Sequence, residues 1–295
     1  MKFIIGILIS VNLLFGFSYN LEPKAVNNDI YCFFGDVKEP NKHNNGFMVN
    51  SCYIKEDGFY IVVDSGPTYI FAKESFEAMK KIDDLPVKYV INTHSHDDHF
   101  LGNGYFKSLG AVIYASEKFH ENRNDGRMHE HILPEAFDGT TTVLPDKYLT
   151  NAEEIILGTT KIINKGLHGH STSDIIVYNE KSKTMLVGDL VFNERVLALR
   201  DGTIKGWLDY IEFFKAYDYE YLIGGHGHDT SRQSYIFTKD YLTRLENEVR
   251  KAIEMGDGID ESAKIIKFDD FSDYALYEEL HSKNVFKAYQ LLEWE

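Results

Sequence analysis

Apolar and polar residues follow two different periods along most of the chain, and these periods predict a mixture of strands and helices. Short apolar runs bounded by turn residues predict strands at 29–34, 50–54, 59–64, 87–92, 111–114, 154–163, 174–179, 183–188 and 219–223. Apolar residues at helical spacing predict helices at 70–82, 207–217, 235–255 and 282–292. Strands that end in polar loops and alternate with helices indicate an α/β (or α+β) fold.

The first eighteen residues have a different pattern. Lys2 precedes an apolar stretch from Phe3 to Phe17, and the segment ends with Gly16-Phe17-Ser18. A positive charge, a short apolar run and small residues before a cut after Ser18 are typical of a secretory signal peptide. The run is short for a membrane span of about 20 residues. We expect a signal peptide at 1–18 and a single periplasmic or secreted domain at 19–295, without stable membrane insertion after cleavage; an uncleaved anchor is the alternative.

Export changes how the two cysteines are interpreted. Cys32 and Cys52 lie in two predicted strands that a polar stretch containing Asn44-Asn45-Gly46 connects. Neighbouring antiparallel strands can bring two cysteines to bonding distance, and an oxidising compartment lets the bond form. We expect a Cys32–Cys52 disulfide, with two unpaired buried thiols as the alternative.

Composition excludes several classes of protein. The chain has 295 residues, 31 Lys and Arg against 46 Asp and Glu, and a net charge of −15. Its 20 Phe and 19 Tyr provide apolar surface for a folded core, which argues against disorder. A strongly acidic chain makes a poor general binder of nucleic acid. We therefore expect no nucleic-acid partner, while the oligomeric state stays open.

The run Thr93-His94-Ser95-His96-Asp97-Asp98-His99 directly follows the predicted strand at 87–92. Two imidazoles in His-x-His lie close enough to share one cation, and Asp98 and His99 can serve a second. Imidazole and carboxylate are the ligands that zinc prefers in catalytic sites. Three later strand ends carry further ligand types, in Gly169-His170-Ser171, Gly188-Asp189 and Gly225-His226-Gly227. Each alone is typical of a turn, but together with the histidine run they predict a metal site.

In this order the motifs resemble the metallo-β-lactamase superfamily. The family pattern is His-x-His-x-Asp-His, a lone His before Ser or Thr, then Gly-Asp and Gly-His-Gly, and Asp64-Ser65-Gly66 matches its early Asp-[Thr/Ser]-Gly turn. The resemblance implies a four-layer αββα sandwich with two metals at one edge. It assigns one zinc to His94, His96 and His170, the other to Asp98, His99 and His226, and the bridging position to Asp189. His168 and His228 are alternatives to His170 and His226, because both lie in His-Gly-His.

The remaining histidines are expected at the surface or beside the ligands; they are His43, His120, His129, His131 and His281. Two of them, His129 and His131, lie in a loop region at 115–145 that could overhang the site.

The resemblance further implies a binuclear zinc hydrolase with a small-molecule substrate, and iron or a mixed metal pair are alternatives to zinc. A hydroxide bridging the metals would attack the carbonyl of an ester, thioester, lactone or amide. Asp98 would orient this nucleophile as the catalytic residue, and Asp64 would support a histidine ligand. Arg195 could pair with a substrate carboxylate, and an exposed salt bridge is the alternative for this residue.

The motifs resemble more than one branch of the family. Asp189 in the bridging place resembles thioesterases of the glyoxalase II type and lactonases, whereas typical β-lactamases carry Cys or Ser there. The segment 188–195, followed by Gly206-Trp207, resembles exported zinc hydrolases of quinoprotein and sulfur-oxidation systems. Three alternatives stay open: a class B-like β-lactamase, a mononuclear iron persulfide dioxygenase, and a non-catalytic metal-binding module.

Overall fold

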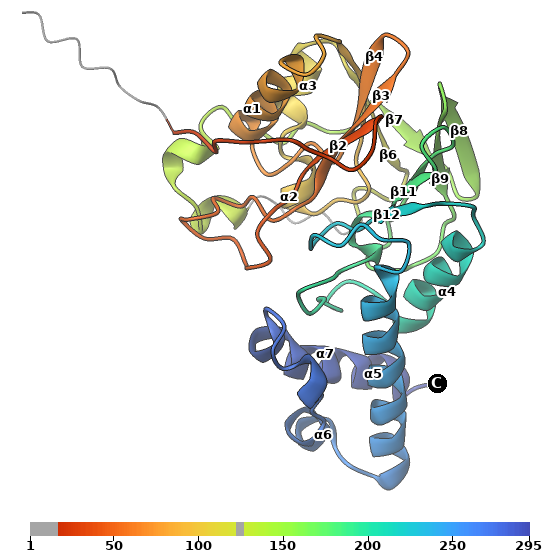
Figure 1. Ribbon diagram of the computed structural model, residues 1–295. Coiled ribbons are helices and arrows are strands. Elements are labelled where there is room, and N and C mark those ends of the chain that lie inside the picture. Colours follow the sequence, from red (N-terminus) through yellow and green to blue (C-terminus); the bar gives the residue numbers. More distant parts are fainter. Residues whose placement is uncertain (1–16, 122–126) are drawn as a thin grey trace, which may run out of the picture.

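The computed structural model describes residues 17–121 and 127–295, so the predicted signal peptide lies outside the described residues except for Phe17 and Ser18. Two β-sheets stack face to face, with helices on both outer faces (Figure 1). Within the described ranges, no helix has the length and apolar character needed to cross a membrane. This arrangement is the αββα sandwich that the motifs imply.

The first sheet has seven strands in the order of the chain. They are β1 (Lys24–Ala25), β2 (Ile30–Phe33), β3 (Ser51–Glu56), β4 (Phe59–Val63), β5 (Val87–Ile91), β6 (Val112–Ser116) and β7 (Lys147–Leu149). Strands β1 to β4 pair antiparallel, and β4 to β7 pair parallel. Cys32 on β2 lies opposite Cys52 on β3, and the structure joins these two buried residues by a disulfide.

The second sheet has five strands in the order β12-β11-β10-β9-β8. They are β8 (Glu153–Leu157), β9 (Thr160–Asn164), β10 (Ile176–Asn179), β11 (Thr184–Leu186) and β12 (Tyr221–Ile223). Only β11 and β12 pair parallel in this sheet. Residues such as Ile54 and Ile61 of the first sheet and Val177 and Leu186 of the second form the core between the sheets.

Helices cover the outer faces because each presents an apolar stripe to a sheet. Helices α1 (Tyr69–Lys80) and α3 (Asn103–Ser108) cover the first sheet, and α4 (Ile204–Lys215) and α5 (Tyr235–Met255) pack against the second. Two further helices, α6 (Ile259–Ile265) and α7 (Tyr277–Leu292), pack with α5 in a group that extends beyond the sandwich (Figure 1). Helix α5 ends at Gly256, whose φ of +81° suits a glycine.

The strand segment predicted at 154–163, with a turn at Leu157-Gly158, is the hairpin of β8 and β9, and Gly158 turns the chain with φ +68°. Other elements differ from their predictions. The loop region before residue 150 contains β7 and two 3-10 turns, Arg127–Glu130 and Pro134–Phe137. Helix α6 was not predicted, and α7 begins five residues before its predicted start at 282. These elements are short or lack a strict apolar period, so local pattern does not reveal them.

Candidate metal centre

The proposed ligands lie where strands of both sheets end. Strand β4 leads to Asp64, and its parallel neighbour β5 leads to the histidine run and the one-turn helix α2 (Asp97–Phe100). Strand β11 leads to Asp189 through the 3-10 turn Gly188–Leu190, and its parallel neighbour β12 leads to His226. Parallel strands end at the same edge of a sheet, so these side chains meet at one edge of the sandwich.

Close backbone approach is built into this edge. A Cβ atom at Gly225 would lie 1.9 Å from Asp189 Oδ1, so only glycine allows the β12 loop to pass the carboxylate. Gly225 of the Gly-Gly-His-Gly run is therefore required by the close packing of the backbone and not by a role in metal binding.

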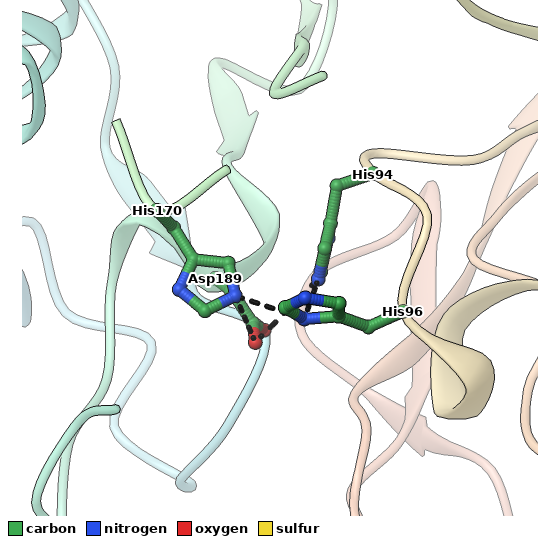
Figure 2. A group of neighbouring side chains, drawn as sticks. All are labelled: His94, His96, His170 and Asp189. Atoms are coloured by element: carbon green, nitrogen blue, oxygen red, sulfur yellow. Dashed lines mark hydrogen bonds and ion pairs between the residues drawn. The ribbon is translucent and has the colours of Figure 1, made fainter. Parts of the chain in front are cut away.

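The first ligand group consists of His94, His96, His170 and Asp189, all buried. Figure 2 shows these side chains pointing toward one another from two sides of the site. His94 Nε2 and His170 Nε2 lie 2.9 and 3.0 Å from His96 Nδ1. Asp189 Oδ2 lies 3.3 Å from His170 Nε2 and 3.7 Å from His94 Nε2. These four ligand atoms can therefore surround one ion.

The second ligand group consists of Asp98, His99 and His226, which are also buried. The other oxygen of Asp189, Oδ1, lies 3.1 Å from His99 Nε2 and 3.3 Å from His226 Nε2. Asp98 Oδ2 lies 3.6 and 3.5 Å from the same two nitrogens. Asp189 thus presents one oxygen to each group, which is the geometry that a bridging ligand needs.

The donor atoms fit a pair of cations. Asp98 Oδ2, His99 Nε2 and Asp189 Oδ1 are buried and have no hydrogen-bond partner among the described residues. Orphaned buried polar atoms cost free energy, and a cation at each group would compensate them. Imidazole and carboxylate ligands suit zinc and also iron.

Burial and the neighbouring carboxylates shift the pKa values of the ligand histidines in opposite directions. Burial lowers the pKa of His94 and of His170 well below the usual value, so both are neutral and ready to bind a metal. Burial also acts to lower the pKa of His99, but the carboxylates of Asp189, Asp98 and Asp64 outweigh it and hold that pKa well above the usual value. A proton and a cation therefore compete for His99 Nε2.

Carboxylates and carbonyls orient three of the imidazoles. His99 Nδ1 donates to Asp64 Oδ2 at 2.8 Å, and His226 Nδ1 donates to the Met48 carbonyl at 2.9 Å. His96 Nε2 lies 3.1 Å from Asp201 Oδ2. Such partners fix which nitrogen of each ring faces the site. Asp64 was predicted in this role, whereas Asp201 was not, since no motif marks it.

The two alternative histidines point away from the ligand groups. His168 Nε2 donates to the carbonyl of Asp201 at 2.7 Å, and His228 Nδ1 pairs with Glu194. His281 was expected at the surface or beside the ligands, and this is wrong. It is buried among the C-terminal helices, where it bonds Tyr241 and Ile266. His131 does line the cavity over the site, as the loop region at 115–145 suggested.

A cavity of about 970 Å³ opens over both ligand groups. Apolar side chains including Met48, Met128 and Phe192 line it together with Arg195 and one face of α7. The ring of Phe192 stacks on His226 with centroids 5.1 Å apart, which fixes that ligand and shields it from water.

Comparison with known proteins gives the family. Residues 44–226 match the model of the metallo-beta-lactamase superfamily, which is more than half of the chain. A solved metallo-beta-lactamase from Pontibacter korlensis is similar with a TM-score of 0.59 and 19% identity, over 76% of this chain and 99% of that one. One from Hirschia baltica has a TM-score of 0.59 and 17% identity, over 76% and 97%. At these identities the two structures show the fold, and the family match shows that the chain belongs to the metallo-beta-lactamase superfamily.

Proposed function

We propose that this protein is an exported hydrolase with two zinc ions that cleaves a carbonyl substrate, namely an ester, thioester, lactone or amide. The observation that carries the proposal is the placement of Asp189, whose two oxygens face two separate groups of buried ligands. A mononuclear dioxygenase needs only one group of ligands. The presence of a second complete group, Asp98, His99 and His226, therefore favours the hydrolase.

Two divalent cations held by these groups would lower the pKa of a shared water and polarise the substrate carbonyl. The residues of the chain supply the remaining functions. Asp98 borders the cavity and would orient the attacking water, accept its proton and deliver that proton to the leaving group. The partners of the imidazoles hold the ligands rigid, so little reorganisation is needed during the reaction.

The cavity over the ligands supports a small substrate. Its volume of about 970 Å³ suits a small molecule. Met48 and Phe192 provide apolar contact directly beside the ligands.

A hydrolase panel tests this function. The zinc-loaded protein is assayed with β-lactams, lactones, thioesters, carboxylic esters and phosphoesters, beside an Asp98→Asn variant and an Asp209→Asn control on α4. We expect one carbonyl class to be cleaved and a loss of about 100-fold or more in kcat for Asp98→Asn alone. One iron per chain and oxygen consumption with a persulfide would instead identify a dioxygenase.

Two features support export. The Cys32–Cys52 disulfide suits an oxidising compartment. A cut after Ser18 would make Tyr19 the first residue, and the backbone nitrogen of Tyr19 already lies 2.8 Å from Glu74 Oε2. The side chain of Tyr19 is anchored too, because its hydroxyl donates to the carbonyl of Asn45 at 2.8 Å. A mature chain would therefore begin with a fixed residue.

A further inference from the structure

We propose that Trp207 on α4 is the positioning residue of the metal ligand His170. In this role, the face of its indole takes the place of the oxygen that each of the other ligand imidazoles contacts through its second nitrogen. The inference rests on the two-metal site of the proposed function and adds a residue to it, independently of the substrate. Trp207 is fully buried, and the centroid of its ring lies 5.0 Å from that of His170.

His170 differs from the other ligand histidines in the surroundings of its second nitrogen. The nitrogen that faces away from the ligand group lies 2.8 to 3.1 Å from an oxygen in His94, His96, His99 and His226. Nδ1 of His170 is buried and has no hydrogen-bond partner within residues 17–121 and 127–295. A buried N–H without a partner costs free energy, and an aromatic face can accept weakly from such a group. His170 Nδ1 therefore needs an acceptor other than an oxygen of the chain.

The rings of His170 and Trp207 meet edge to face. Their planes are inclined by 73° at a centroid distance of 5.0 Å, which is typical of such pairs. The polar edge of the indole is occupied elsewhere, because Trp207 Nε1 donates to the carbonyl of Leu190 at 2.9 Å. The face of the indole is therefore left for the edge of the imidazole. Phe192 closes the same apolar pocket, with its ring centroid 5.8 Å from that of His170 and 6.1 Å from that of Trp207.

The start of α4 fixes the indole against the loop that carries the ligand. Thr203, the N-cap of α4, donates from its backbone nitrogen to the Gly169 carbonyl at 2.9 Å and from its hydroxyl to the His168 carbonyl at 2.5 Å. A Cβ atom at Gly206 would lie 2.0 Å from the same His168 carbonyl, so only glycine lets the helix come this close. The helix therefore presents Trp207 at a fixed place beside this loop.

The same indole also reaches the bridging ligand. Leu190, whose carbonyl accepts from Trp207 Nε1, directly follows Asp189 in the chain. Trp207 thus fixes two side chains of the first ligand group, His170 through its ring and Asp189 through the backbone beside it. An aromatic face attracts the Nδ1 proton less strongly than a carboxylate does. His170 should therefore be a weaker donor to its ion than His99, which contacts a carboxylate.

Nuclear magnetic resonance of the zinc-loaded protein tests the ring contact without any change of sequence. The ring current of an indole shifts a proton over its face upfield, whereas a hydrogen bond to oxygen shifts a proton downfield. We expect the Nδ1 proton of His170 to resonate upfield of the Nδ1 protons of His99 and His226, and to show nuclear Overhauser effects to the indole protons of Trp207. A His170 Nδ1 proton that resonates downfield with the other two, or that exchanges rapidly with water, would overturn the proposal.

Two variants separate the face of the indole from its N–H, and a third is the control. Trp207→Phe keeps an aromatic face and loses the N–H, whereas Trp207→Leu loses both. Trp294→Leu changes the other tryptophan of the chain, which is 86% exposed. In zinc titrations with competing chelators, we expect about tenfold weaker binding of one ion for Trp207→Leu and a loss of only a few-fold for Trp207→Phe. Trp294→Leu should bind both ions as the parent protein does.

Equal zinc affinity of Trp207→Leu and the parent, or equal losses for Trp207→Leu and Trp207→Phe, would overturn the role of the indole face. If Trp207→Leu does not fold, the resonance of His170 in the parent and in Trp207→Phe still decides the proposal. Neither measurement depends on turnover, so a protein that cleaves no carbonyl substrate would refute the hydrolase and leave both tests decisive. A protein that binds no zinc would refute the two-metal site together with the role of Trp207.

Discussion

Asp64 Oδ2 accepts a hydrogen bond of 2.8 Å from His99 Nδ1, and both side chains are buried. The same carboxylate accepts from the backbone nitrogen of Thr93 at 2.7 Å and from the Thr93 hydroxyl at 2.8 Å. The end of β4 therefore fixes both the start of the histidine run and the nitrogen that His99 presents to the site. Asp64 has φ +58°, a conformation that Asp and Asn tolerate better than most residues.

Asp64→Asn should weaken the second metal site without unfolding the protein. The amide oxygen can still accept from the Thr93 nitrogen, which leaves the amide NH2 facing His99 Nδ1. His99 would then carry its proton on Nε2, the atom that must bind the metal. We expect about 10–100-fold weaker binding of one ion of the two. Zinc titration with competing chelators measures this, and unchanged affinity for both ions would contradict it; Asp209→Asn is the control.

The neighbouring histidines offer a matched test of the ligand assignment. His170→Ala and His226→Ala should each lose an ion, whereas His168→Ala and His228→Ala should retain both, because their rings point away from the groups. Asp189→Ala should reduce occupancy at both groups and abolish hydrolysis, since each of its oxygens faces one group. Metal content by mass spectrometry of the purified variants decides this. If His168→Ala lost metal and His170→Ala did not, the assignment would be wrong.

Sequence motifs could predict which side chains gather in the two groups, because these side chains are concentrated in short runs at strand ends. His94, His96 and His99 lie within six residues, and glycines mark Asp189 and His226. Among the partners of these side chains, Asp64 could be predicted from its own motif, but the others could not. The Met48 carbonyl bears no residue signature, and Asp201 reaches His96 only through the folded loop before α4.

The burial of His281 could not be predicted either, because it depends on contacts that no sequence motif marks. Its position was expected to be exposed or close to the metals, because a single histidine in a helical pattern gives no information about its neighbours. Burial comes from the packing of α5 against α7, a contact between segments about 40 residues apart. Tertiary packing of this kind is not encoded in local periodicity.

A buried carboxylate should tie the two sheets together. Glu56 on β3 accepts hydrogen bonds from the Thr159 nitrogen at 3.0 Å, from the Thr160 hydroxyl at 2.7 Å and from Asn179 Nδ2 at 3.3 Å. Glu56→Ala would leave the Thr159 nitrogen and the Thr160 hydroxyl without this acceptor, whereas Asn179 Nδ2 would keep its bonds to the two threonine hydroxyls. We expect the free energy of unfolding to fall by about 2–4 kcal/mol, measured by chemical denaturation at constant metal content. Glu154→Ala on the exposed side of β8 is the control, and an equal effect of both variants would contradict this role.

His281 should make stability depend on pH. Burial lowers its pKa to about 4, and the positive charges of Lys267 and Arg244 act in the same direction, while the hydrogen bond to the Ile266 carbonyl opposes them. Because that carbonyl can only accept, His281 Nε2 carries the proton, and Nδ1 accepts from the hydroxyl of Tyr241 at 2.9 Å. Protonation of Nδ1 would remove the acceptor of the Tyr241 hydroxyl proton.

The protein should become less stable as the pH falls, because His281 binds a proton more readily in the unfolded chain than in the folded protein. Between about pH 6.5 and 4, the unfolded chain binds a proton on His281 that the folded protein does not, so the free energy of unfolding falls as the pH falls through this window. His281→Gln should therefore show a flatter dependence of Tm on pH than the parent protein. The exposed His120→Gln serves as the control, and parallel Tm curves for His281→Gln and the parent would contradict the prediction.

Removal of residues 1–18 should create an ion pair at the new N-terminus. A free α-amino group on Tyr19 would carry a positive charge near neutral pH, 2.8 Å from a carboxylate oxygen of Glu74. Glu74→Gln should then cost about 0.5–1 kcal/mol of stability in a protein that begins at Tyr19. It should cost less in a protein with Gly-Ser added before Tyr19, because the charge is moved away while the backbone hydrogen bond remains.

Intact-mass measurement and N-terminal sequencing of exported protein establish the first residue, and thermal unfolding of the four proteins measures the coupling. The coupling should also weaken when salt is added, because the pair is only partly buried. A first residue other than Tyr19 would refute cleavage after Ser18. An equal effect of Glu74→Gln in both backgrounds would refute the ion pair and leave the cleavage site unaffected, so the two parts of the prediction can fail separately.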